Sequence, residues 1–341
     1  MRTGQKSSPV RALIVAVPET AGSALYGMVD VLAAAGNIWQ SLVRTEPEAK
    51  MITPSIVSTS KTPFRCGNGI PVAPDYAIAD CPEADLIIVP ELWLGPEEPL
   101  HGRYPKLMAW LRARYAAGAY VYSACAGSVM LAESGLLDNL AATSHWAYSD
   151  LFRTCYPAVR FHAEPNLVFA DNEGRLVTAG GATSWHDLAI HIISKHCGPA
   201  EAMKIAKIYM LKWHDEGQSP YTSLVRAHAH ADSVVRSCED WLAQRFREPH
   251  AVRLVVDQAK IPERSLKRRF KAATGRTLID HVQALRIEEA KRLLETGELP
   301  VERIAFEVGY EQTAFFRRLF KRLTGLTPGQ YRRMFQPILA A

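Results

Sequence analysis

The last third of this 341-residue chain contains one two-helix pattern twice, and this repeat restricts the possible folds more than any other feature. The two copies are VRLVVDQAKIPERSLKRRFKAATG at 252–275 and VERIAFEVGYEQTAFFRRLFKRLTG at 301–325. In each copy a short helix with apolar residues at helical spacing precedes a turn. The second helix carries two bulky apolar residues four positions apart, Leu266 and Phe270 or Phe316 and Phe320, which predicts one buried face. The repeat therefore predicts an all-α domain with two helix-turn-helix units, in which Gly309 supplies the second turn.

The face opposite these apolar residues is cationic in both copies. Such a helix can lie in the major groove of DNA, where arginine and lysine reach guanine edges and phosphates. Arg268 and Arg318 are corresponding positions 50 residues apart, and their helices would contact grooves roughly 34 Å apart on one duplex face. The alternative is that the charges form the solvated face of an ordinary helical bundle. The cationic residues are Arg264, Lys267, Arg268 and Lys271, then Arg317, Arg318, Lys321 and Arg322.

Charge is divided unevenly along the chain. Residues 229–341 contain 21 Lys and Arg against 14 Asp and Glu, a net charge of +7, whereas the rest contains 19 against 21, a net charge of −2. A basic segment attached to a near-neutral one favours a module that binds a polyanion. The charge distribution and the repeat therefore indicate the same function, DNA binding.

The second copy and its surroundings, LPVERIAFEVGYEQTAFFRRLFKRLTGLTPGQYRRMF, closely resemble the AraC/XylS family of transcription regulators over about residues 230–336. The family pattern is present at Ile304, Ala305, Val308, Gly309, Tyr310, Phe316, Arg318, Phe320, Lys321, Gly325, Pro328 and Tyr331. The resemblance implies that Arg318 contacts DNA. It makes further candidate contacts of Arg264, Ser265, Lys267, Arg268, Lys271, Thr313, Phe315, Arg317 and Lys321. Phe315 and Arg317 are bulkier than the small polar residues common there in the family, which leaves the base preference open.

In the first two thirds of the chain, short apolar runs alternate with helical stretches. The runs are VRALIVAV at 10–17, DLIIVP at 85–90 and AYVYS at 119–123, and the helices are expected at 24–36, 107–118 and 126–135. This alternation predicts a mostly parallel sheet with helices on both faces, a doubly wound α/β domain. The polar stretch HDEGQSPYTS predicts a linker. The predicted organisation is an α/β domain at 1–210, a linker at 211–228 and the all-α domain at 229–341.

The strand at 119–123 leads through Ala124 directly into Cys125 and a helix. Small residues at this bend allow a side chain to occupy a strained turn, and the helix N-terminus there is expected to favour a thiolate at Cys125. Together with His145, 20 residues later, this elbow resembles the ThiJ/PfpI family, whose fold is that of class I glutamine amidotransferases. The resemblance spans about residues 10–205 and implies a flavodoxin-like sandwich that senses a ligand.

Catalytic members of that family hold the cysteine with an acid that follows the first strand. In this chain the corresponding place falls on Ala24, and either Glu19 or Glu91 could substitute. Three interpretations of Cys125 remain open: an inert residue lining a ligand pocket, a contact or redox switch for an effector, and a catalytic nucleophile. The predicted effector pocket consists of Cys125, His145, Trp146, Glu19 and Glu91.

Composition excludes several other classes of protein. An apolar fraction of 48% with 22% charged residues indicates a globular chain. The apolar run after the first residues stops at Pro18, so we expect no signal peptide, no membrane span and a cytoplasmic protein. The cysteines show no Cys-x-x-Cys pair, which indicates reduced thiols, and we expect no metal and no cofactor. Ser184 and Asp187 have the spacing of a capping box that begins a helix.

These patterns favour a sequence-specific transcription regulator that is not an enzyme. Its expected partners are a double-stranded DNA operator, RNA polymerase, an unidentified small-molecule effector and a second copy of the chain. The alternative is an enzyme of the ThiJ/PfpI kind, a hydratase, amidase or glyoxalase that uses Cys125 and His145 and carries a DNA-binding tail.

Overall fold

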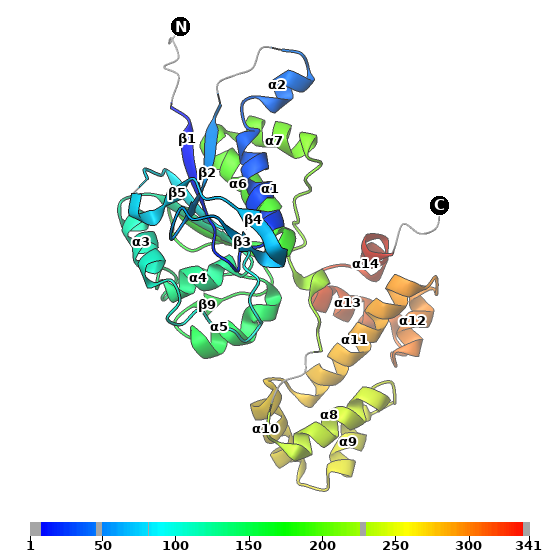
Figure 1. Ribbon diagram of the computed structural model, residues 1–341. Helices are drawn as coiled ribbons and strands as arrows, with labels where there is room; N and C mark the ends of the chain where they lie inside the picture. Colours follow the sequence, from blue (N-terminus) through cyan, green and yellow to red (C-terminus); the bar gives the residue numbers. More distant parts are fainter. Residues whose placement is uncertain (1–7, 46–49, 81, 226–229, 337–341) are drawn as a thin grey trace. The chain divides into compact units, whose positions relative to one another are not determined.

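A computed structural model describes residues 8–45, 50–80, 82–225 and 230–336 (Figure 1). The chain separates into two compact units, Met1–Gln218 and Ser219–Ala341, called here the N-terminal and C-terminal units. Within the described ranges, none of the helices combines the length and apolarity needed to cross a bilayer. Five cysteines are free thiols, and Cys81 lies outside the described residues.

A seven-stranded sheet forms the centre of the N-terminal unit, in the order β10-β11-β7-β6-β1-β2-β5. Its pairs are parallel except for the edge strand β10, which runs antiparallel to β11. The strands are β1 (Val10–Val15), β2 (Ile52–Ser58), β5 (Tyr76–Ala77), β6 (Leu86–Val89), β7 (Tyr120–Ala124), β10 (Leu167–Phe169) and β11 (Leu176–Ala179). Shorter elements are α2 (Ile38–Leu42), β3 (Phe64–Cys66), β4 (Ile70–Val72), β8 (Ala141–Ala142) and β9 (Arg160–Phe161).

Alternate side chains of the central strands enter two separate cores, because successive residues of a strand point to opposite faces. Leu13 and Val15 pack in one core, and Ala12 and Ile14 pack in the other. The first core is covered by α3 (Pro105–Ala116), α4 (Gly127–Glu133) and α5 (Ser149–Cys155). The second is covered by α1 (Gly22–Ala33), α6 (Trp185–Cys197) and α7 (Pro199–Ile208). The predicted doubly wound α/β fold is confirmed.

Three parallel strands, β2, β5 and β11, go beyond the sequence prediction, and β5 has only two residues. The apolar pattern of β2 is broken by Pro54 and Ser55, which are only partly buried. β11 is short and contains Thr178, which is buried and accepts a hydrogen bond from the Thr143 amide. Polar residues satisfied by distant partners weaken the local pattern by which a strand is recognised.

Seven helices follow in the described part of the C-terminal unit, and they form two cores. They are α8 (Ser233–Arg245), α9 (Ala251–Ala259), α10 (Glu263–Thr274), α11 (Leu278–Thr296), α12 (Val301–Glu307), α13 (Thr313–Thr324) and α14 (Pro328–Phe335). One core joins α8, α9 and α10 to the start of α11, and the other joins the end of α11 to α12, α13 and α14. The predicted all-α domain with two similar units is confirmed, and α11 connects them.

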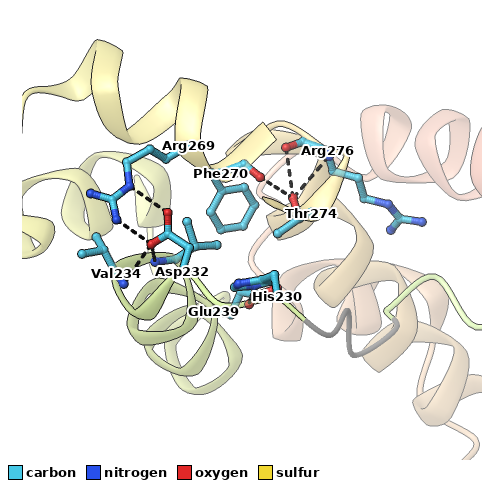
Figure 2. Close-up of polar contacts among 9 residues, drawn as sticks. His230, Asp232, Val234, Glu239, Arg269, Phe270, Thr274 and Arg276 are labelled. Atoms are coloured by element: carbon cyan, nitrogen blue, oxygen red, sulfur yellow. Dashed lines mark hydrogen bonds and ion pairs between the residues drawn. The ribbon is translucent and has the colours of Figure 1, made fainter. Parts of the chain in front are cut away.

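The two helix-turn-helix units end their second helices, α10 and α13, in the same way. Thr274 Oγ1 donates to Phe270 O at 2.7 Å and accepts from the amide of Arg276 at 3.3 Å (Figure 2). Thr324 makes the equivalent contacts with Phe320 O and the amide of Leu326. The following glycines, Gly275 and Gly325, both have a left-handed backbone, which ends a helix at low cost. Sequence repetition has therefore produced repeated stop signals as well as repeated cores.

Asp232 closes the start of α8 and links it to α10 (Figure 2). Its carboxylate accepts from the amides of Val234 and Val235, both at 3.1 Å, and pairs with the guanidinium of Arg269 at 2.7 and 2.8 Å. Hydrogen bonding from Arg269, followed by the two helix amides, lowers the pKa of Asp232 to about 2. An acid with a lowered pKa stabilises the fold above its unfolded pKa, and that contribution disappears as pH falls through the folded value.

We expect Asp232→Asn to destabilise the C-terminal unit at pH 7, because asparagine retains the helix cap but loses the ion pair. The difference from wild type should shrink as pH falls from about 4 to about 2, where the native carboxylate also loses its charge. Denaturant unfolding at several pH values measures this effect. Asp257→Asn, at an exposed position of α9, is the control. A difference independent of pH would contradict the role of the ion pair.

Candidate functional site

The cationic residues of α10 lie on its exposed face. Arg264, Lys267, Arg268 and Lys271 are exposed, and Ser265 is partly buried. Leu266 and Phe270 are fully buried on the opposite side. Arg269, the remaining arginine of this helix, is bound to Asp232 and is therefore engaged within the unit. The structure thus separates four exposed cations from one structural cation in a run that looks uniform in the sequence.

Helix α13, in the second helix-turn-helix unit, likewise has an exposed cationic face and a buried apolar face. Arg317, Arg318, Lys321 and Arg322 are exposed, as is Phe315, and Thr313 at the helix start is partly buried. Phe316, Leu319 and Phe320 form the buried side. The structure therefore gives α10 and α13 corresponding cationic surfaces.

Acidic neighbours hold some of these cations. Lys267 pairs with Glu263, and Arg317 pairs with Glu302, each at 2.5 Å between nitrogen and oxygen. Arg268 and Arg318 have no ion-pair partner among the described residues. A guanidinium without a competing carboxylate can bind phosphate or guanine without first breaking an internal pair.

Arg286 on α11 was not singled out by the sequence analysis, yet it bridges the two helix-turn-helix units. Its guanidinium donates to the carbonyls of Phe246 (2.7 Å), Glu248 (3.0 Å) and Gly309 (2.8 Å). It also lies over the ring of Tyr310, 5.0 Å from the centroid. A single arginine in a long amphipathic helix carries no local signal of such a role. It fixes the second turn against the loop that precedes α9.

The turn of the second helix-turn-helix unit requires glycine, as predicted. Gly309 has φ +88°, and a Cβ there would lie 2.5 Å from Arg247 O. The first helix-turn-helix unit makes its turn differently, with Lys260 in the left-handed region at φ +52°. Since non-glycine residues adopt this conformation at some cost, the two turns are not equivalent.

Cys125 occupies a strained elbow between β7 and α4. It has φ +51° and is 3% exposed. Its amide donates to the carbonyls of Ala179 and Gly180, and its carbonyl accepts from the hydroxyls of Ser128 and Ser144. The bend also requires the next glycine, because a Cβ on Gly127 would lie 2.3 Å from Val89 O. The predicted strained turn at this cysteine is confirmed.

An acid reaches Cys125 from the end of β6. Glu91 Oε1 lies 3.6 Å from the Cys125 sulfur, and burial raises the pKa of this carboxyl. Ala24, at the place of the family acid, is fully buried in α1. Glu19 instead accepts from Tyr104 at 2.6 Å and Arg103 at 3.1 Å. Of the two acids that could substitute, Glu91 is the one that contacts the thiol.

The expectation that the helix N-terminus favours a thiolate at Cys125 is wrong. Burial raises the pKa of Cys125 well above its usual value, and the neighbouring Glu91 raises it further. The backbone amides of Ala126 and His145 act in the opposite direction but contribute less. A short helix cannot compensate for removing the sulfur from water beside an acid. Burial and Glu91 therefore oppose ionisation of the thiol at this elbow.

The loop that carries His145 and Trp146 lies next to the elbow. The His145 ring accepts from the amide of Ala147 through Nδ1 at 3.1 Å and packs against the Trp146 ring, 4.9 Å between centroids. This hydrogen bond identifies Nδ1 as an acceptor, so the neutral ring carries its proton on Nε2. The structure thus brings Glu91 and the backbone of His145 to Cys125, with the His145 and Trp146 rings packed on each other in the adjoining loop. Glu19 is held by other partners.

The capping box expected at Ser184 and Asp187 is wrong. Ser184 precedes α6 but caps no amide; its hydroxyl donates to Asn166. Asp187 is fully buried and accepts from Asn166 and from His214. A series of buried hydrogen bonds through Asn166 and Asp187 has thus taken the place of the local cap.

Within the described ranges, no cluster of three His, Cys, Asp or Glu side chains could hold a metal ion.

Comparison with known proteins assigns both units. The sequence profile of the DJ-1/PfpI family matches residues 11–195, and that of a helix-turn-helix domain matches residues 255–334. The chain is 27% identical over 278 residues to the HTH-type transcriptional regulator CdhR of Pseudomonas aeruginosa, covering 81% of this chain and 80% of that protein. It is 32% identical over 139 residues to the isonitrile hydratase of Pseudomonas putida, covering 40% of this chain and 56% of the hydratase.

Among solved structures, Drosophila melanogaster DJ-1beta aligns with a TM-score of 0.50 at 18% identity, covering 60% of this chain and 100% of that one. At this level of identity the alignment shows a shared fold only. The profile match to the N-terminal unit extends over more than half of the chain. The chain therefore belongs to the DJ-1/PfpI family and carries an AraC-type helix-turn-helix domain after its α/β domain.

Proposed function

We propose that this protein is a transcription regulator that binds a specific DNA operator through α10 and α13 and is controlled by its N-terminal unit. The observation that carries the proposal is the pair of helices whose exposed faces are cationic and whose opposite faces are buried in separate cores. Arg268 and Arg318 occupy corresponding places on them. The similarity to CdhR, a protein named as an HTH-type transcriptional regulator, supports the same function.

The N-terminal unit would sense a small molecule through the loop and elbow around Cys125, His145, Trp146 and Glu91. A buried thiol with a raised pKa is a weak nucleophile, which supports binding over turnover. By the same proposal the regulator acts in the cytoplasm as a homodimer and contacts RNA polymerase at its promoter. An effector would act only through unequal affinity for DNA-competent and DNA-incompetent arrangements of the chain.

Selection of bound duplexes from a random pool with the full chain would identify the operator, and Arg318→Ala would then test the interface. We expect this variant to lose about 1–3 kcal/mol of binding free energy, roughly 5- to 150-fold in Kd, if Arg318 makes a bidentate base contact. Arg153→Ala removes an exposed arginine from the N-terminal unit and should leave Kd unchanged. Equal isotherms for wild type and Arg318→Ala would exclude this residue from the groove.

A second candidate function is catalysis at the elbow. The strained backbone of Cys125, its contact with Glu91 and the similarity to isonitrile hydratase favour this alternative. Hydration of a simple alkyl isonitrile by the wild type, lost in Cys125→Ala, would support it. Operator binding by the same variant would show that its C-terminal unit is still folded.

A further inference from the structure

The segment that ends the N-terminal unit, Leu211–Gln218, is not a free linker. The amide of His214 donates to Asp187 Oδ1 at 3.0 Å, and its ring Nδ1 lies 2.9 Å from Asp187 Oδ2. Asp187 is fully buried, so this contact holds the segment against α6. The first half of the predicted linker is therefore a strap attached to the α/β domain.

Gln218, the last residue of the strap, inserts its side chain into the loop that carries His145. Only 3% of Gln218 is exposed, and its own amide donates to Glu164 O at 2.8 Å. The side-chain oxygen accepts from the Trp146 amide at 3.2 Å. The side-chain nitrogen lies 2.9 Å from Ser144 O, 3.2 Å from Pro165 O and 3.2 Å from Thr143 Oγ1. A buried carboxamide with partners on both its donor and acceptor sides is held in one position.

The slot that receives this carboxamide borders the Cys125 elbow. A Cβ on Gly180 would lie 2.3 Å from Gln218 Nε2, so glycine leaves room for the side chain. The carbonyl of Gly180 accepts from the Cys125 amide, and the hydroxyl of Ser144 donates to the Cys125 carbonyl at 2.8 Å. Gln218 thus contacts two residues that each bond directly to the peptide groups of Cys125. A shift of the elbow or of its loop would move the partners of Gln218.

Immediately after Gln218 the chain becomes attached to the other unit. Lys291 Nζ donates to Thr222 O at 2.8 Å, and the Leu224 amide donates to Glu288 at 2.7 Å. With both attachments intact, the tether from Gln218 to Thr222 spans four residue steps and reaches at most about 14 Å. Release of Gln218, with His214 still bound to Asp187, would lengthen the tether to the eight residue steps from His214 to Thr222, about 29 Å.

We propose that Gln218 is a latch that reports occupancy of the Cys125 elbow to the DNA-binding unit. The inference rests on the proposed function and specifies its regulation. With the latch closed, the C-terminal unit is confined by the short tether from Gln218 to Thr222. An effector that binds at the elbow takes the place of the Gln218 carboxamide. It must therefore offer N–H donors to the carbonyls of Ser144 and Pro165, and an acceptor to the amide of Trp146. Its binding frees the strap, and the longer tether permits more DNA-competent arrangements.

The test uses the full chain with Gln218→Ala, and with Gln218→Glu, which keeps the shape but turns an oxygen toward two carbonyls. Peptide-level hydrogen exchange should accelerate in 211–218 and 143–147. Unchanged exchange elsewhere in the N-terminal unit would show that the variants fold. Kd for the selected duplex should fall at least fivefold, the lower end of common allosteric couplings. Lys212→Ala, which removes an exposed lysine of the same strap that pairs with Glu216 at 3.7 Å, should change neither measurement.

Unchanged exchange in 211–218 would overturn the latch itself. Faster exchange with an unchanged or higher Kd would overturn its control of the DNA-binding unit. If the wild type selects no duplex at all, the proposed function fails, and this result is distinct because it does not depend on Gln218.

Discussion

Replacing Phe320 with alanine is expected to lower the free energy of unfolding of the C-terminal unit by about 3–5 kcal/mol. The side chain is fully buried, and its ring lies 5.8 Å from that of Phe316 and 5.4 Å from that of Tyr331. Removing it leaves a cavity in the core that joins α11, α12, α13 and α14. Because a small domain is stable by only about 5–15 kcal/mol, this change removes a large part of the total.

Denaturant unfolding of the full chain, followed by circular dichroism together with peptide-level hydrogen exchange, measures this loss. Phe306→Ala is the matched control, because that ring is 63% exposed on α12. Exchange within the N-terminal unit should be the same in both variants, since its two cores share no residue with the core of Phe320. A loss below about 1 kcal/mol would mean that the core around Phe320 is not packed as described.

Raising the salt concentration from 50 to 200 mM should weaken binding of the selected duplex by about a thousandfold or more. Binding that neutralises 6–10 phosphates loses about 10³–10⁵ in affinity over this range through counterion release. The exposed cations of α10 and α13 are numerous enough for such a footprint. A plot of log Kd against log salt, obtained by fluorescence anisotropy, gives the slope.

Lys271→Ala and Lys321→Ala should each reduce that slope by about one if each lysine contacts a phosphate. Arg153→Ala should leave the slope unchanged, and thermal unfolding at both salt concentrations controls for effects on the fold. A flat response of the wild type would show that the cationic faces of α10 and α13 are not the DNA footprint.

Much of the helix-turn-helix domain could be predicted because its signals are local. The spacing of Leu266 and Phe270 specifies one buried face, and the spacing of Phe316 and Phe320 specifies the other. Gly309 supplies a turn through its own backbone conformation. The roles of Arg269 and Arg286 could not be predicted, because their partners lie 23 to 40 residues away in the sequence.

The elbow illustrates the opposite case. The strand, the bend and the small residues around Cys125 are contiguous, so the strained turn could be predicted. The ionisation state of the thiol could not, because it depends on burial and on Glu91, which arrives from a neighbouring strand. The helix N-terminus by itself favours a thiolate, but the desolvation that tertiary packing imposes outweighs this local effect.

The sequence by itself determined the two folds, their order and the repeated cationic helices, since these follow from periodicities of two and 3.6 residues and from the turns between them. Only the tertiary structure decided which acid meets Cys125, which arginines are engaged internally and where Gln218 inserts. Those contacts join residues 34, 37 and 74 positions apart. A local sequence pattern cannot predict contacts between residues so far apart, because the partners meet only after the sheet and the helices have packed.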